Sequence, residues 1–94
     1  MPTLRDLKQT YNIPFQLFTD ILETIETALY YNIQHEKLIE YTLDHCSIET
    51  YSTQYSTYTK FVKNFIQYLH SQDFDTYDAF TEHMQMVCDM YTVY

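Results

Sequence analysis

Residues 14–31 read PFQLFTDILETIETALYY, and this stretch decides the fold class. Its large apolar residues recur at alternating steps of three and four positions, which is the period of one α-helical face. These residues are Phe15, Phe18, Leu22, Ile25 and Leu29, while acids and threonines fill the other face. Because the residue before a proline is pushed out of helical geometry, the helix is expected to begin at Pro14 and to end near Tyr31.

Two further helices are predicted around this one. Thr3 and Asp6 resemble a capping box, so a short helix is expected from Thr3 to about Thr10, followed by a break before Pro14. After a connection at residues 32–34, a helix is expected from Gln34 to Cys46. Its buried positions are expected to be Leu38 or Ile39, Leu43 and Cys46.

The second half of the chain predicts two long helices. The first runs from Ile48 to Leu69, with a packing seam formed by Tyr51, Tyr55, Tyr58, Val62, Phe65 and Leu69. Serine and threonine between Thr50 and Thr59 lower the helix propensity, and a start as late as Ser56 is the alternative. After a connection at Ser71–Asp75, the last helix runs to the C-terminus. Its apolar positions are Tyr77, Phe80, Met84, Val87, Tyr91 and Tyr94.

The whole chain, residues 1–94, is therefore expected to form a single all-α domain. Ninety-four residues allow one compact core, and a chain without glycine has no material for tight β-hairpin turns. The predicted architecture is a small helical bundle of four longer helices plus a short N-terminal helix, most simply in an up-and-down arrangement.

Location and redox state are predicted from what the sequence lacks. No long apolar run and no secretory or transit signal is found, so the protein is expected in the cytoplasm, away from membranes. Cys46 and Cys88 do not form a CxxC pair and are expected to be buried free thiols.

The charge balance selects the class of partner. Thirteen Asp and Glu stand against five Lys and Arg, which gives a formal net charge of -8. Phosphate backbones and anionic lipids require basic residues, so direct binding to nucleic acid or to a membrane is disfavoured. The expected partner is a basic protein surface, most plausibly that of a nucleic-acid-binding protein.

Catalysis, cofactors and metals are not predicted. The residues three positions before His35, His45, His70 and His83 are not acids, so the Glu-x-x-His pattern of di-iron bundles is missing. A chain without glycine cannot form a Gly-rich phosphate loop. The acids are expected on polar helix faces, away from any catalytic cleft.

Acidic stripes and tyrosines give the candidate binding residues. Glu36, Glu40 and Asp44 are spaced to share one helical face, and Asp78, Glu82 and Asp89 share another, although like charges at this spacing disfavour the helix. Tyrosine is abundant, and an exposed tyrosine is a favoured anchor at protein interfaces. The candidate partner-binding residues are Asp20, Glu23, Glu26, Glu36, Glu40, Tyr41, Asp44, Tyr68, Asp73, Asp75, Asp78, Glu82 and Asp89.

The leading hypothesis is a protein-binding inhibitor, which could act as a DNA mimic in the basic cleft of a nuclease or another nucleic-acid-processing enzyme. In size and charge the chain is similar to the small acidic antirestriction and anti-CRISPR proteins carried by phages. One alternative is a self-associating helical module, a homodimer paired through the Ile48–Leu69 seam. Another is an acidic helix-turn-helix regulator with a basic patch formed by Arg5, Lys8, Lys37, Lys60 and Lys63. The simplest alternative is that the acids only keep a tyrosine-rich surface soluble.

Overall fold

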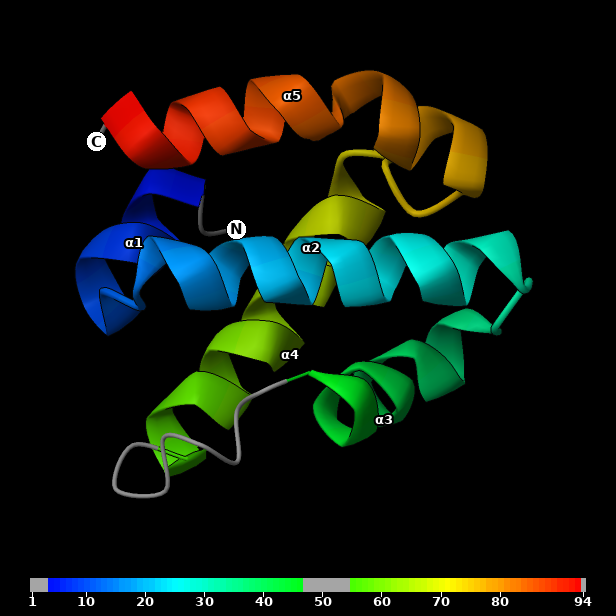
Figure 1. Ribbon diagram of the computed structural model, residues 1–94, viewed down its shortest axis with the longest axis horizontal. Coiled ribbons are helices and arrows are strands. Elements are labelled where there is room, and N and C mark those ends of the chain that lie inside the picture. Colours follow the sequence, from blue (N-terminus) through cyan, green and yellow to red (C-terminus); the bar gives the residue numbers. More distant parts are fainter. Residues whose placement is uncertain (1–3, 47–54, 94) are drawn as a thin grey trace.

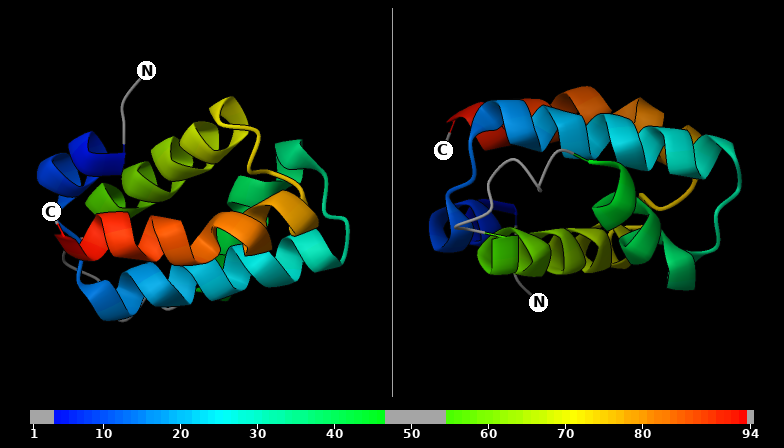
Figure 2. Two further views of the ribbon diagram at one scale, coloured as in Figure 1. Left: turned by 90° about the horizontal axis from the view of Figure 1, so that it is seen from above. Right: turned by 60° about the horizontal axis from the view of Figure 1, so that its bottom comes forward.

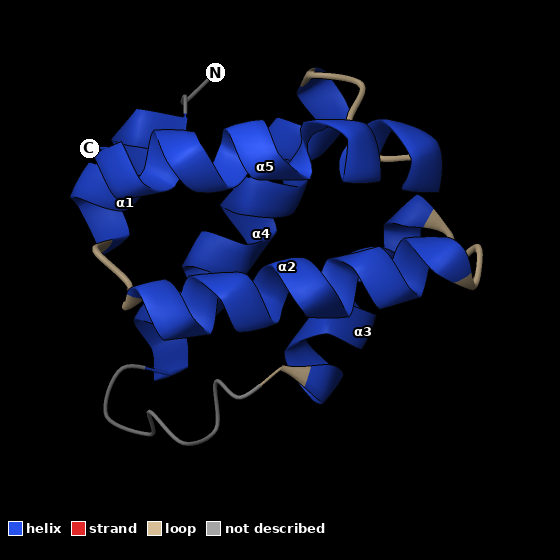
Figure 3. Ribbon diagram, turned by 45° about the horizontal axis from the view of Figure 1, so that its top comes forward, coloured by secondary structure: helices blue, strands red, loops and turns tan. Residues whose placement is uncertain are grey.

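The computed structural model describes residues 4–46 and 55–93, and every regular element in these ranges is a helix. The five helices are α1 (Leu4–Tyr11), α2 (Phe15–Tyr30), α3 (His35–His45), α4 (Tyr55–Ser71) and α5 (Tyr77–Val93) (Figures 1 and 3). The predicted all-α class, with four longer helices and a short N-terminal one, is confirmed.

The described helix boundaries agree with the prediction to within two residues. Pro14 is the N-cap of α2, as its position in the sequence indicated. Thr76 precedes α5, and its hydroxyl accepts a hydrogen bond from the Ala79 N–H at 3.3 Å, which satisfies one of the open donors at that helix start. The predicted capping residue Thr3 and the predicted start of the fourth helix at Ile48 lie outside the described residues.

Helices α2 and α4 end in the same type of turn, built without glycine. After α2, the N–H groups of Asn32 and Ile33 donate to the carbonyl oxygens of Leu29 and Ala28 at 3.0 Å each. After α4, the N–H groups of Asp73 and Phe74 donate to the carbonyl oxygens of His70 and Leu69 at 3.2 and 2.8 Å. This double pattern is the Schellman motif, which requires one residue in left-handed backbone geometry.

Asparagine and aspartate supply that left-handed geometry. Asn32 and Asp73 both have φ of 59°, and Asn12, which follows α1, has φ of 47°. Among residues with a Cβ, Asn and Asp tolerate this region best, because their short polar side chains form local hydrogen bonds. The absence of glycine therefore does not prevent sharp helix ends, because Asn and Asp take its place at these positions.

The helices form two layers. Helices α2 and α5 lie side by side and antiparallel in one layer, while α4 runs obliquely behind α2 (Figures 1 and 2). In the second layer α4 contacts both α1 and α3. The simple up-and-down arrangement was therefore wrong, because α5 returns to pack against α2 and α1 and not chiefly against α4, its neighbour in sequence.

Phe18 of α2 joins the two layers. Its ring is fully buried and stacks on Tyr91 of α5, with centroids 3.9 Å apart and planes inclined by 8°. On its other side it contacts Phe65 and Phe61 of α4 in edge-to-face geometry, at 5.5 and 6.3 Å between centroids. Aromatic pairs in these geometries stabilise a core beyond the area they bury.

Helix α4 is buried on more than one face because α1 and α3 pack against it and Phe18 of α2 contacts its aromatic residues. Of the predicted seam positions in the described ranges, Tyr58, Val62, Phe65 and Leu69 are buried inside the chain, whereas Tyr55 at the start of α4 is 43% exposed. Phe61 and Ile66, outside the seam, are fully buried as well. A seam that is used internally cannot also pair with a second chain, so this part of it does not support the predicted homodimer.

Besides Tyr55, the exposure of Tyr68 and Phe15 was wrongly predicted. Tyr68 was expected at the surface as an interface anchor, but it is only 8% exposed, because α4 also buries the face that carries it. Phe15 was expected in the core and is 46% exposed, because α2 buries a face centred on Leu17, Phe18 and Ile21, and Phe15 lies at its edge at the start of the helix.

No helix in the described ranges combines the length and the apolar character needed to cross a lipid bilayer.

Candidate functional site

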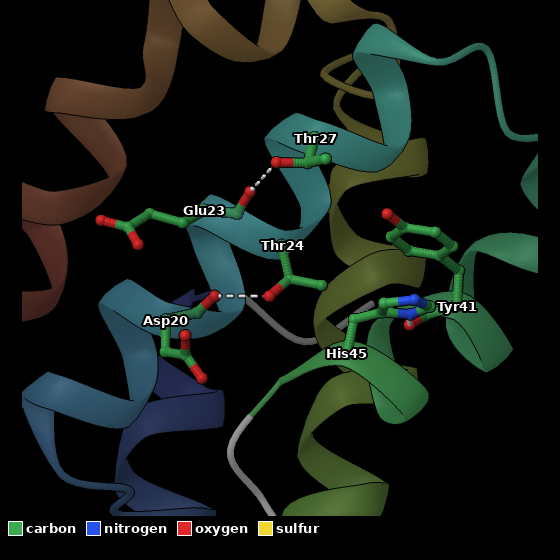
Figure 4. A pocket seen from close by; sticks show the side chains of 6 residues that line it. All are labelled: Asp20, Glu23, Thr24, Thr27, Tyr41 and His45. Atoms are coloured by element: carbon green, nitrogen blue, oxygen red, sulfur yellow. Dashed lines mark hydrogen bonds between the residues drawn. The ribbon is translucent and has the colours of Figure 1, made fainter.

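The acidic residues predicted on α2 and α3 meet where these two helices pack together. A hollow of about 280 Å³ lies between them, lined by Asp20, Glu23, Thr24, Thr27, Tyr41 and His45. Figure 4 shows Tyr41 and His45 on the α3 side of this hollow and Asp20, Glu23 and Thr24 on the α2 side, with the Glu23 side chain extending away from the two rings.

A second hollow adjoins the first on α3. It has a volume of about 290 Å³ and is lined by Ile33, Lys37, Glu40, Tyr41, Asp44 and His45. Tyr41 and His45 line both hollows and so form the ridge between them. We define the α2–α3 acidic groove as the carboxylates Asp20, Glu23, Glu40 and Asp44 together with the ridge residues Tyr41 and His45.

The ridge is held in place by two contacts within α3. The rings of Tyr41 and His45, one helical turn apart, stack with centroids 4.0 Å apart and planes inclined by 16°. The Nδ1 of His45 lies 2.9 Å from the Tyr41 carbonyl oxygen, which places a proton on that nitrogen if it donates this hydrogen bond. The other ring nitrogen, Nε2, then carries the imidazole lone pair.

The threonines of the groove satisfy their own hydroxyl groups. Thr24 Oγ1 donates to the Asp20 carbonyl oxygen at 2.8 Å, and Thr27 Oγ1 donates to the Glu23 carbonyl oxygen at 3.0 Å (Figure 4). Such bonds to the preceding helical turn are common for threonine within helices. Carboxylates and aromatic rings therefore dominate the chemistry that the groove offers to a ligand.

Three tyrosines lie next to the groove at the far end of α2. Tyr30, Tyr31 and Tyr77, with Glu26 and Thr27, line a hollow of about 190 Å³, and Thr27 also lines the first hollow of the groove. The ring of Tyr30 meets those of Tyr31 and Tyr77 in edge-to-face geometry, at 5.3 and 5.5 Å between centroids. Tyr30 and Tyr31 are 63% and 65% exposed, so this tyrosine cluster is available to a partner.

The structure brings together some of the predicted binding residues and separates others. Five acids gather with Tyr41 at the groove and the tyrosine cluster: Asp20, Glu23, Glu26, Glu40 and Asp44. Five others are exposed but do not line these hollows: Glu36, Asp73, Asp78, Glu82 and Asp89. Asp75 lies elsewhere, beside His70, and Tyr68 is buried.

The prediction missed His45 and Tyr77 as lining residues. The position of His45 one turn after Tyr41 could have indicated that the two rings stack. Tyr77 could not have been found from the sequence, because it reaches the cluster from α5 across the contact between α2 and α5.

The five basic side chains lie on three helices, α1, α3 and α4. Lys37 lines the second hollow beside Glu40 and Asp44, whereas Lys8 donates to the Tyr91 carbonyl oxygen and lies 5.1 Å from the centre of the Tyr91 ring. Lys60 and Lys63 are exposed on α4. Of the predicted basic patch, Lys37 therefore lies among acids of α3, and the helix-turn-helix hypothesis stays a prediction.

Comparison of the chain with protein-family models, with curated proteins and with solved structures finds no match. The geometry of the groove is therefore the basis on which a function is assigned.

Proposed function

We propose that this protein binds a basic, arginine-bearing protein surface through the α2–α3 acidic groove and the adjoining tyrosine cluster. In this proposal it acts as an inhibitor that occupies the nucleic-acid-binding cleft of its partner. The observation that carries the proposal is the aromatic ridge of Tyr41 and His45, which has acidic residues of α2 on one side and acidic residues of α3 on the other.

Arginine matches this chemistry best among the protein side chains. Its planar guanidinium stacks on aromatic rings and forms paired hydrogen bonds with carboxylates. A cation over a tyrosine ring contributes about 0.5–1 kcal/mol at an exposed site, and more when water is excluded. The hollows are small, about 280 and 290 Å³, so they suit individual long side chains better than a drug-sized ligand.

The charge of the groove supports a nucleic-acid-binding protein as the partner. A single helical stripe such as Glu36, Glu40 and Asp44 places one charge every ~6 Å, against one per ~1.7 Å along duplex DNA. Convergence of α2 and α3 adds a second row of carboxylates to the first. The net charge of -8 would also attract a basic cleft over a longer range.

A matched pair of charge-removal variants tests the proposal. The groove variant carries Asp20→Asn, Glu40→Gln and Asp44→Asn, and the control variant carries Asp73→Asn, Asp78→Asn and Glu82→Gln. Both remove the same number of negative charges with nearly isosteric side chains, but only the first set lines the groove. Unfolding curves of both variants establish that each remains folded.

The wild type and both variants are used to capture proteins from host lysate at about 50 mM and about 500 mM salt. We expect the wild type and the control variant to retain a nucleic-acid-binding protein at low salt, and the groove variant to lose it. Duplex DNA added in excess should release the captured protein, since both would compete for one cleft. Equal capture by both variants, or capture that is unchanged at high salt, would refute the electrostatic groove.

A further inference from the structure

Away from the groove, three side chains able to bind a metal ion come together from different parts of the chain. His35 is the first residue of α3, His70 lies in the last turn of α4, and Asp75 lies between α4 and α5. Each offers one ligand atom, and these three atoms all lie within 4.8 Å of one another. The Nδ1 of His70 is 2.6 Å from the Asp75 Oδ2, and the rings of His35 and His70 have their centroids 4.3 Å apart.

The two glycine-free helix ends fix the positions of these residues. The turn after α2 closes with the Ile33 N–H bonded to the Ala28 carbonyl oxygen, two residues before His35. The turn after α4 closes with the Phe74 N–H bonded to the Leu69 carbonyl oxygen, one residue before Asp75. Since backbone hydrogen bonds define both turns, the Cα positions of the three side chains are set by the fold.

We propose that His35, His70 and Asp75 bind one divalent transition-metal ion of the zinc class, with water completing the coordination. Two imidazoles and one carboxylate form a ligand set that Zn²⁺ takes in proteins, and imidazole also suits Ni²⁺ and Cu²⁺. With bonds of about 2.0–2.2 Å in tetrahedral geometry, two ligand atoms of one zinc ion lie roughly 3.3 Å apart. The observed spread of up to 4.8 Å needs an adjustment of only about 1.5 Å.

The side chains are free to make that adjustment. His35 is exposed and the side chain of His70 is 60% exposed, so rotation of either ring is not opposed by core packing. Exposed side chains change rotamer within picoseconds to nanoseconds. On binding through Nδ1 of His70, the ion takes the place of the hydrogen between this nitrogen and Asp75, and the neutral imidazole carries its proton on Nε2.

There is also room for water beside the carboxylate. Asp75 lines a hollow of about 200 Å³ between the α2–α3 turn and the start of α5, together with Leu29, Asn32, Ile33, Thr76 and Tyr77. One water molecule occupies about 30 Å³ of liquid, so a coordinated water and its neighbours fit in this space. The bound ion would tie α3, α4 and the α4–α5 connection to one point.

The test uses Zn²⁺ and Co²⁺ on the full chain. Wild type, His35→Ala and Asp75→Asn are compared by titration calorimetry with Zn²⁺, by the zinc-induced rise in the midpoint of thermal unfolding, and by the visible spectrum of bound Co²⁺. His45→Ala is the matched control, because His45 is also an exposed histidine at a helix end but lies in the groove. Metal-free unfolding curves verify that the variants fold.

We expect one Zn²⁺ per chain, a higher unfolding midpoint with zinc, and Co²⁺ bands typical of nitrogen and oxygen ligands. His35→Ala and Asp75→Asn should each weaken Zn²⁺ binding by at least about tenfold, while His45→Ala leaves it unchanged. Three results would each overturn the proposal: equal affinity in wild type and His35→Ala, a Co²⁺–thiolate charge-transfer band indicating cysteine ligation, or no zinc effect on the wild type. Loss of partner capture in the groove variant with zinc binding intact would show that the two sites are independent.

Discussion

The phenol of Tyr91 should make the stability of this protein fall at alkaline pH. Tyr91 is 3% exposed, and its hydroxyl donates to the Ile13 carbonyl oxygen at 2.7 Å, linking α5 to the corner between α1 and α2. Burial raises the pKa of Tyr91 to about 12 from 10.0, because a phenolate is poorly solvated in the core. The charge of Tyr58 raises this pKa further, while the hydrogen bond to Ile13 lowers it.

The stability falls at high pH because the folded protein holds the Tyr91 proton more tightly than the unfolded chain does. Because the pKa of Tyr91 is higher in the folded chain than in the unfolded chain, its contribution to stability is complete below about pH 10 and is lost as the pH rises through about 12. With these two values, about 1.4 kcal/mol of the free energy of unfolding is lost between about pH 8 and about pH 11.

The variant Tyr91→Phe isolates this contribution. It removes the hydroxyl and leaves the Ile13 carbonyl oxygen without that bond, which should cost about 1–2 kcal/mol at about pH 8. At about pH 11 the wild type has lost a similar amount through ionisation and the variant has not, so the two stabilities should nearly coincide. The free energies are measured by urea unfolding at both pH values, with circular dichroism as the probe.

A difference between wild type and variant that stays the same at both pH values would refute the reasoning, because the folded protein would then not hold the Tyr91 proton more tightly than the unfolded chain. Tyr30→Phe is the control. Tyr30 is 63% exposed, so its substitution should leave the alkaline loss of stability as it is in the wild type.

Four further substitutions test the packing and the turns by urea unfolding at neutral pH. Phe18→Ala should lower the free energy of unfolding by about 3–5 kcal/mol, because Phe18 is fully buried between the layers. Phe15→Ala on the same helix should lower it by less than about 1 kcal/mol. Equal losses in the two variants would contradict the two-layer core. Thr42→Val should raise stability by about 1 kcal/mol, because the Thr42 hydroxyl is buried without a hydrogen-bond partner among the described residues; a loss of stability would show that the hydroxyl is satisfied. Asn32→Gly should raise stability by about 0.5 kcal/mol, because glycine adopts the left-handed geometry at φ 59° without a Cβ clash, and a decrease would mean that the Asn32 side chain stabilises the turn.

The sequence was sufficient for the helices and insufficient for their arrangement. The spacing of Phe18, Leu22 and Ile25 predicted α2 because the periodicity of a helix is a local property. The packing of α5 against α2 depends on the stacking of Phe18 and Tyr91, two residues far apart in the chain, and no local pattern predicts it. Tyr68 was misplaced for the same reason, since a helix covered on two faces has no single apolar stripe.

The candidate site residues could be predicted where they share one helix and could not be predicted where they come from distant parts of the chain. Glu40, Tyr41 and Asp44 could be identified from the sequence because they belong to one helix, and α2 contributed Asp20 and Glu23 by similar reasoning. The cluster of His35, His70 and Asp75 could not be identified from sequence spacing, because His35 is far from the other two in the sequence and the three residues meet only after the chain has folded.

The pairing of the chain's two ends also bears on how the protein is made. The bonds from Lys8 to the Tyr91 carbonyl oxygen and from Tyr91 to the Ile13 carbonyl oxygen span 83 and 78 positions. During synthesis the N-terminal segment emerges from the ribosome long before its partner has been translated. Until α5 has been synthesised, the face of the Phe18 ring that stacks on Tyr91 in the folded protein is uncovered. During this interval chaperones and proteases can reach that apolar surface of the nascent chain.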